Sequence, residues 1–157
     1  MKKGMYFGLL LMLGFSLMSA TCSSDDDDID FDDDCGNCSI ERLETVLSAC
    51  SDWYIDDLER NNNNLDNNYI GYRFNFSIDN GVTVTWGNNT ETGTWSVEES
   101  GNSIYVTFDI PGFDDINDTW RLDDIDNDDD DDDDDAFEVD FEIGDDDLEF
   151  ENENCDF

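Results

Sequence analysis

The stretch YRFNFSIDNGVTVTW, residues 72–86, decides the fold class. Apolar and polar side chains alternate in both of its halves, and the apolar positions are Tyr72, Phe74, Phe76, Ile78, Val82, Val84 and Trp86. A period of two residues gives a β-strand one apolar face and one polar face. Between the halves, Asp79-Asn80-Gly81 is typical of a tight hairpin turn. The stretch therefore predicts two antiparallel strands joined by a short turn.

The same alternation recurs along the chain on both sides of this stretch. We predict eight strands, over residues 52–58, 69–78, 82–87, 92–98, 103–110, 119–125, 136–143 and 147–151. Gly87-Asn88-Asn89 and Ser100-Gly101-Asn102 are further turn signals between neighbours. Short antiparallel strands in sequential hairpins favour a mainly β fold, an eight-stranded up-and-down barrel. The alternative is a two-sheet β-sandwich.

A different period precedes the first strand, in SIERLETVLSA, residues 39–49. Ile40, Leu43, Val46 and Leu47 recur at spacings of three and four residues, which places them on one face of a helix. Ser39 is suited to cap its first turn. We predict one short N-terminal helix that packs on the strands, because a helix of this length is marginal alone.

The N-terminus has the layout of a bacterial secretory signal. Met1-Lys2-Lys3 is followed by the apolar residues 5–18 and by small residues just before Cys22. The apolar segment is shorter than the roughly 20 residues that span a membrane. We predict a signal peptide over residues 1–21 and a lipidated Cys22. Secretion without a lipid, with Cys22 free or disulfide-bonded, is the alternative.

Two Asp-rich, low-complexity segments lie outside the strand pattern. Residues 22–37 follow the predicted lipidation site, and an unbroken run of eight aspartates occupies residues 128–135. Acidic runs are usually solvated, and adjacent aspartates disfavour a strand. We interpret residues 22–37 as an extended tether and residues 123–135 as a solvated loop of a folded domain, residues 38–157.

Composition restricts the class of ligand. The chain has 44 Asp plus Glu, 6 Lys plus Arg and no His. Removal of Lys2 and Lys3 with the signal peptide leaves four arginines and a formal charge of about −40. Such a charge repels nucleic acid and anionic lipid headgroups. The 4 Trp, 5 Tyr and 11 Phe are too many for a disordered protein, so we expect one folded domain, as a monomer.

Four cysteines remain after Cys22: Cys35, Cys38, Cys50 and Cys155. An even number in an exported chain indicates two disulfides, and four cysteines allow three pairings. We predict Cys35 with Cys38 and Cys50 with Cys155, since the latter two bracket the strand pattern. A redox role for the Cys35–Cys38 motif is disfavoured, because no βαβ pattern follows and nearby carboxylates raise a thiol pKa.

One register of the first Asp-rich segment resembles a calcium-binding loop. Its candidate ligands are Asp30, Asp32, Asp34 and Glu41, with Cys35 where the turning glycine should stand. We keep weak Ca²⁺ binding there as a hypothesis and expect diffuse association of cations with both Asp runs. No other cofactor is expected.

Enzyme activity is not expected, because the chain has no His and no Ser or Cys beside a recognisable base. The remaining candidate site is the barrel interior, where large aromatic residues either line a ligand pocket or fill the core. These residues are Trp53, Phe74, Phe76, Trp86, Trp95, Phe108, Trp120 and Phe141. Arg73 and Arg121 either serve an anionic ligand or pair with acids, and pairing is the favoured interpretation.

An ordered series of segments carries a family resemblance: Cys50-Ser51-Asp52-Trp53, Leu58-Glu59-Arg60-Asn61, Gly71-Tyr72-Arg73-Phe74-Asn75-Phe76, Gly93-Thr94-Trp95-Ser96, Asp118-Thr119-Trp120, Leu148-Glu149-Phe150 and Cys155. Residues 38–155 resemble the lipocalin-like domains of Bacteroidota lipoproteins. The acidic start after Cys22 resembles the export signal of that group. The resemblance implies a lipid-anchored protein on the outer face of the outer membrane that binds a small apolar or amphiphilic ligand. The alternative is an acidic envelope-surface or interaction protein that binds divalent cations through its Asp runs.

Overall fold

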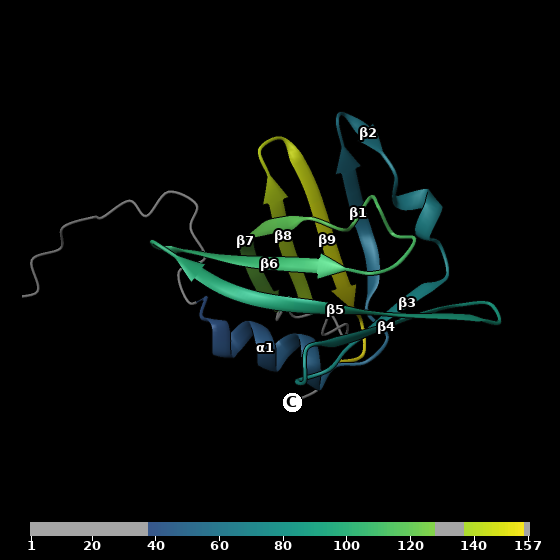
Figure 1. Cartoon of the computed structure of the whole chain (residues 1–157), viewed down its shortest axis with the longest axis horizontal. Coiled ribbons are helices and arrows are strands. Elements are labelled where there is room, and N and C mark those ends of the chain that lie inside the picture. Colours follow the sequence, from purple (N-terminus) through teal and green to yellow (C-terminus); the bar gives the residue numbers. More distant parts are fainter. Residues whose placement is uncertain (1–37, 128–136, 156–157) are drawn as a thin grey trace, which may run out of the picture. The chain divides into compact units, whose positions relative to one another are not determined.

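The computed structural model describes residues 38–127 and 137–155, which form one curled antiparallel sheet and two short helices (Figure 1). The elements are α1 (Ile40–Ala49), β1 (Tyr54–Arg60), β2 (Asn63–Asn64), the 3-10 helix η1 (Asp66–Tyr69), β3 (Tyr72–Phe76), β4 (Gly81–Trp86), β5 (Asn89–Ser100), β6 (Ser103–Asp109), β7 (Thr119–Asn127), β8 (Phe137–Ile143) and β9 (Asp146–Asn152). Within these two ranges, no helix has the length and apolar character needed to cross a membrane.

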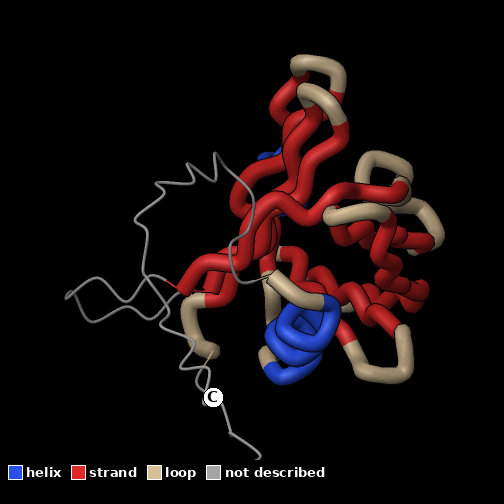
Figure 2. Tube along the Cα trace, turned by 90° about the vertical axis from the view of Figure 1, so that its left-hand side faces the viewer, coloured by secondary structure: helices blue, strands red, loops and turns tan. Residues whose placement is uncertain are grey.

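The strand order is β2-β1-β9-β8-β7-β6-β5-β4-β3, and every neighbouring pair is antiparallel. This single up-and-down sheet confirms the predicted fold class and is not the two-sheet alternative. It curls into a half-barrel (Figure 2). Trp53 and Phe74 connect β1 to β3 at one point, because their backbones exchange two hydrogen bonds with N···O distances of 3.0 and 2.7 Å.

The sheet has nine strands rather than eight because Asn63–Asn64 forms the short strand β2 against the end of β1. Asn61 and Asn62 make the turn with φ angles of 53° and 61°. Asparagine tolerates this left-handed conformation better than most residues. Four consecutive asparagines show no apolar alternation, so the period of two predicts no strand there.

The predicted strand over residues 69–78 is too long at both ends. Tyr69 ends η1, and the chain leaves the sheet after Phe76. The N–H of Asn80 donates to the carbonyl of Ser77 at 3.0 Å, and Asn80 adopts a φ of 67°. The turn directs Ile78 toward solvent, and the Ile78 side chain is 81% exposed. The hairpin turn therefore overrides the apolar alternation at Ile78.

Strand β7 also extends further than expected. Residues 123–127 of the predicted loop 123–135 are strand, and residues 128–135 lie outside the described residues. A register shift between Leu122 and Asp124 lets Leu122 and Ile125 both lie in the core. A similar shift between Ile55 and Leu58 does the same in β1. Both shifts interrupt the period of two, which explains the misplaced boundaries.

The predicted N-terminal helix is confirmed as α1. The hydroxyl oxygen of Ser39 accepts a hydrogen bond from the N–H of Arg42 at 3.0 Å, as an N-cap does. Leu43, Val46 and Leu47 are buried, and the helix contacts β3 and β5.

The predicted disulfide between Cys50 and Cys155 is present, with Cα atoms 5.3 Å apart. It ties the end of α1 to the segment that follows β9. Cys38 is also disulfide-bonded. Its predicted partner, Cys35, lies outside the described residues, as do Cys22 and the predicted signal peptide and tether.

Seven of the eight aromatic residues considered for the interior lie in the core: Trp53, Phe74, Phe76, Trp95, Phe108, Trp120 and Phe141. Phe108 contacts the rings of Phe76, Phe141 and Phe150 with centroids 5.8–5.9 Å apart. The three buried tryptophans donate their indole N–H groups to the carbonyls of Leu47, Ser77 and Ile116. Rings in mutual contact and satisfied N–H groups are features of a packed core.

Candidate functional site

A pocket of about 380 Å³ lies at the end of the half-barrel where η1, β3, β4, β5 and the β6–β7 connection meet. We call it the mouth pocket; it is lined by Asn68, Tyr69, Tyr72, Trp86, Glu91, Pro111, Gly112 and Phe113. Trp86 is the one residue of this set among the eight aromatic residues predicted for the interior. Tyr69 and Phe113 also belong to the hydrophobic core, so the mouth pocket adjoins that core.

Phe113 is the centre of the pocket wall. Its ring lies 6.2 Å from that of Tyr69, 6.0 Å from Tyr72 and 5.7 Å from Trp86. Tyr72 and Trp86 stack on each other with centroids 5.1 Å apart and planes 11° apart. Each such pair contributes about 0.5–1.5 kcal/mol beyond simple burial. These contacts fix the aromatic walls before any ligand arrives.

The connection between β6 and β7 brings Phe113 to this place. The side-chain amide of Asn117 accepts from the N–H of Ile110 at 2.7 Å and donates to the carbonyl of Ile110 at 2.8 Å. The N–H groups of Ile116 and Asn117 both donate to the carbonyl of Phe113 at 2.9 Å. The β6–β7 connection is thus held by hydrogen bonds within itself, so the pocket wall that Phe113 forms is rigid.

Gly93 lets this connection approach the sheet. A Cβ atom at Gly93 would lie 2.4 Å from the carbonyl oxygen of Asp109 and 2.7 Å from the Cα atom of Ile110. Both neighbours are backbone atoms, which cannot rotate away. Only a glycine fits this close approach.

Tyr69 forms the side wall with its ring, which is buried. Its hydroxyl donates to a carboxylate oxygen of Asp115 at 3.3 Å. Burial, together with the negative charge of Asp115, raises the pKa of Tyr69 above its ordinary value. Tyr69 is therefore neutral at physiological pH.

Glu91 is a carboxylate on the inner face of the sheet. The strand register places Phe74 opposite Val84 and Val84 opposite Glu91. Directly opposed residues of antiparallel strands point to the same face, and Phe74 and Val84 are fully buried. Glu91 is partly buried, and its carboxylate accepts the N–H of Thr92 at 3.2 Å. Within residues 38–127 and 137–155, no lysine or arginine forms an ion pair with Glu91.

Three of the four aromatic lining residues were missed as site candidates. The period of two predicts both Tyr69 and Tyr72 as strand residues and gives no sign that they line a pocket. Phe113 follows Pro111-Gly112 in a segment with no period. An aromatic residue directly after a Pro-Gly turn was the one available signal.

Neither Arg73 nor Arg121, the two arginines considered for an anionic ligand, lines the pocket. Arg121 pairs with Glu142 and, at 2.9 Å, with Asp123. Arg73 donates to the carbonyl of Tyr72 at 2.8 Å and lies 5.2 Å from the centre of the Tyr54 ring. Both side chains are engaged on other parts of the sheet.

The opposite, outer side of the sheet is strongly acidic. Acids oppose acids across β7, β8 and β9 in the pairs Asp124–Asp140, Asp126–Glu138, Glu138–Glu151, Asp140–Glu149 and Glu142–Asp147, which we call the acidic face. Burial, followed by repulsion from neighbouring carboxylates, raises the pKa of Asp140 to about 6 and that of Glu149 to about 7. A hollow of about 250 Å³ lies among these side chains.

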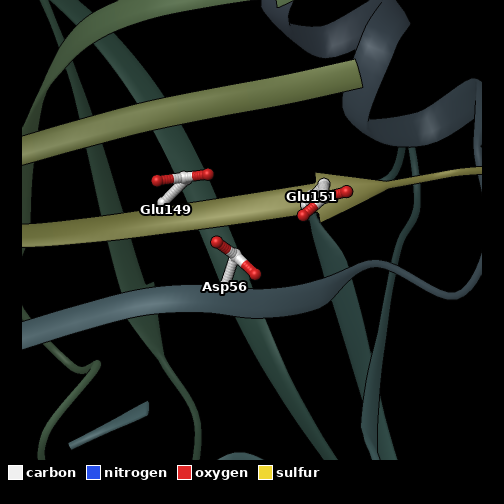
Figure 3. A group of neighbouring side chains, drawn as sticks. All are labelled: Asp56, Glu149 and Glu151. Atoms are coloured by element: carbon white, nitrogen blue, oxygen red, sulfur yellow. The ribbon is translucent and has the colours of Figure 1, made fainter. Parts of the chain in front are cut away.

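Two carboxylates of this face and one of the neighbouring strand β1 gather closely (Figure 3). Asp56 of β1 and Glu149 and Glu151 of β9 each place one oxygen within 4.8 Å of the others. Calcium takes six to eight oxygens, so three carboxylates alone do not define a metal site. Of the predicted calcium ligands, Glu41 is exposed in the first turn of α1, and Asp30, Asp32 and Asp34 lie outside the described residues.

No family model matches this chain, and searches of curated proteins and of solved structures find no similar protein. The fold and the site therefore define its class by geometry. It is an antiparallel β half-barrel with a preformed aromatic pocket at one end.

Proposed function

We propose that this protein is a non-enzymatic, lipid-anchored lipoprotein of the bacterial cell surface whose mouth pocket binds a small ligand with an apolar body. The observation that carries the proposal is the pocket itself. Its volume of about 380 Å³ falls in the range of small-molecule sites, and four of its eight lining residues are aromatic.

The surface location rests on the sequence: the signal over residues 1–21, the candidate lipidation site Cys22 and the resemblance to lipocalin-like lipoproteins. The Cys50–Cys155 disulfide supports export, because disulfides persist in oxidising compartments outside the cytoplasm.

The pocket, rather than the barrel interior, is the place for a ligand. Phe76, Phe108 and Phe150 contact one another in the interior, so a ligand there would have to displace core rings. At the mouth, Trp86 is only partly buried. A ligand that covers the partly buried rings of Tyr72 and Trp86 gains roughly 25 cal/mol per Å² of apolar surface, and the rigid walls lose little conformational entropy.

A fluorescent apolar probe tests the proposal. We would titrate N-phenyl-1-naphthylamine into the full chain carrying Cys22→Ser, so that no lipid anchor competes for the probe. Trp86→Ala should weaken binding of the probe at least severalfold, because it removes a main wall of the pocket. Ile78→Ala is the matched control, since Ile78 is an exposed apolar residue outside the pocket. An equal loss of probe affinity in Trp86→Ala and Ile78→Ala, or the absence of saturable probe binding to the unmutated pocket, contradicts the proposal.

The alternative function, cation binding by an acidic envelope-surface protein, stays a prediction because both Asp runs lie outside the described residues. The acidic face adds negative charge in the described part. Calorimetric titration with Ca²⁺ at physiological salt separates the two functions. The alternative predicts a saturable heat and a higher melting temperature, whereas our proposal predicts unchanged affinity for the apolar probe.

A further inference from the structure

We infer that the mouth pocket selects an organic cation with an apolar body, of the alkylammonium or quaternary ammonium class, through its aromatic walls and Glu91. This inference rests on the proposed function, since it specifies the ligand of the same pocket. Three features of the pocket carry it: the arrangement of the rings, the sign of the charge at their edge and the engagement of every arginine elsewhere.

The rings form a corner that suits a cation. Tyr72 and Trp86 are nearly parallel, and Phe113 stands almost perpendicular to them, at 83° and 81°. Tyr72 and Trp86 are only partly buried, so part of each ring is open to a bound group. Ring faces carry negative electrostatic potential and attract ammonium groups, and quaternary ammonium ligands are held in this way by aromatic cages.

The charge of the pocket has one sign. Glu91 is the one formally charged residue among its eight lining residues, and no lysine or arginine is among them. Its carboxylate lies on the inner face of β5, next to the aromatic walls. A ligand carboxylate or phosphate would be repelled there, whereas an ammonium group would gain an ion pair in a partly desolvated place.

The protein's own arginines do not compete for Glu91, because all four are engaged elsewhere. Arg60 pairs with Asp118 at 3.0 Å and Asp146 at 3.4 Å and lies 4.7 Å from the centre of the Trp120 ring. Arg42 donates to the carbonyl of Ile125 at 3.1 Å. Arg73 and Arg121 have the partners described above. Within residues 38–127 and 137–155 no cationic side chain neutralises Glu91, which leaves this carboxylate to a bound cation.

The indole of Trp86 is also unlike those of the other tryptophans. Trp53, Trp95 and Trp120 each donate their N–H to a backbone carbonyl. In the described ranges, no protein group accepts the N–H of Trp86. The indole of Trp86 is thus positioned by packing and ring contacts without a hydrogen bond from its N–H, which leaves its polar edge available to a ligand hydroxyl or to water.

The test compares ligands of one shape and different charge. We would titrate choline, its neutral isostere 3,3-dimethylbutan-1-ol and the anion 3,3-dimethylbutanoate into the full Cys22→Ser chain at 150 mM salt, following tryptophan fluorescence. Choline should bind about tenfold more tightly than the neutral alcohol, and the anion more weakly than either. Glu91→Gln should remove most of the preference for choline over the alcohol.

Glu98→Gln is the matched control. Glu98 lies on the same strand β5, is exposed and belongs to the outer face, so this variant removes the same charge without touching the pocket. It should leave the preference for choline unchanged, which separates a local ion pair from general attraction to an acidic protein. Trp86→Leu should weaken the binding of choline more than that of the alcohol, because leucine keeps apolar volume but lacks the aromatic ring.

The outcomes separate this inference from the proposed function. If the alcohol and choline bind equally well and Glu91→Gln changes neither, the cation inference is wrong while the pocket still binds a small ligand. If Glu98→Gln lowers the affinity for choline as much as Glu91→Gln does, the attraction is not local to the pocket and the inference is again wrong. If neither choline, the alcohol nor the naphthylamine probe binds, the proposed function fails as well.

Discussion

Gly93 is the residue where a single methyl group would most directly disturb the mouth pocket. Gly93→Ala places a Cβ atom against the backbone of Asp109 and Ile110, so that β6 or the connection that carries Phe113 must move. We expect a loss of about 2 kcal/mol in the free energy of unfolding, within the usual cost of overpacking. Urea denaturation measures it.

Gly81→Ala is the control for this prediction. The nearest atom to its new Cβ would be the hydroxyl oxygen of Ser77 at 2.8 Å, which is the end of a rotatable side chain. Gly81→Ala should therefore cost less than 1 kcal/mol. Equal costs for the two variants would contradict the assigned close approach at Gly93.

Phe76 and Ile78 test the point at which β3 ends. The sequence places both on one apolar face, whereas the structure buries Phe76 and exposes Ile78. Phe76→Ala should cost about 3–5 kcal/mol, and Ile78→Ser should change the free energy of unfolding by less than about 0.5 kcal/mol. A large loss from Ile78→Ser, measured by urea denaturation, would show that the strand continues through this residue.

At the scale of elements, the acidic face gives the sheet a dependence on pH. The pKa values of Asp140, about 6, and Glu149, about 7, lie above those of the unfolded chain, near 4. The folded state thus binds these protons more tightly. The resulting stabilisation is fully present below the unfolded pKa and is lost as the pH rises through about 6 to 7.

We therefore expect a higher melting temperature at pH 5 than at pH 8, measured by circular dichroism. Glu149→Gln removes one of the opposed charges and should stabilise the protein by about 0.5 kcal/mol at pH 8 while reducing the difference between the two pH values. Glu98→Gln should leave that difference unchanged. A melting temperature that rises from pH 5 to pH 8 would contradict the assigned repulsion.

Periodicity predicted the elements better than their ends. Helix α1 was predicted to within one residue because Ser39 and its apolar stripe give independent signals. The strands were found wherever the period of two is intact. The period fails at the shifts beside Leu122 and Ile55, where an extra residue enters the strand, and at β2, where asparagines have no apolar face. Backbone pairing with neighbouring strands, which local sequence does not encode, decides these positions.

At the scale of the whole molecule, the Cys50–Cys155 disulfide closes nearly the entire sheet into a loop, with 105 residues of separation. Replacing both cysteines by alanine should cost about 4 kcal/mol in the chain-entropy account, because the unfolded chain regains freedom. Guanidinium denaturation under oxidising conditions measures this. Cys38→Ala should cost much less, since its predicted partner is only three residues away. Similar losses in both variants would contradict the dominant role of the long loop.

The half-barrel and its disulfide could be predicted from the sequence, but the mouth pocket could not. Phe113 lies in the β6–β7 connection, and Glu91 lies near the start of β5. They come together because Gly93 and Asn117 hold that connection against the sheet. Such a meeting depends on tertiary packing between segments that carry no shared motif. The aromatic count indicated a core or a pocket, and the structure assigns seven of the eight candidates to the core and Trp86 to the pocket.

The four tryptophans provide the most direct test of the central claim, that ligands enter the mouth pocket and not the core. In nitrogen-15 NMR spectra each indole N–H gives a separate signal, and the Trp86→Leu variant identifies that of Trp86. Addition of choline should shift the Trp86 signal and leave those of Trp53, Trp95 and Trp120 in place. A shift of the three core signals with Trp86 unmoved, or no shift at saturating choline, would contradict the account.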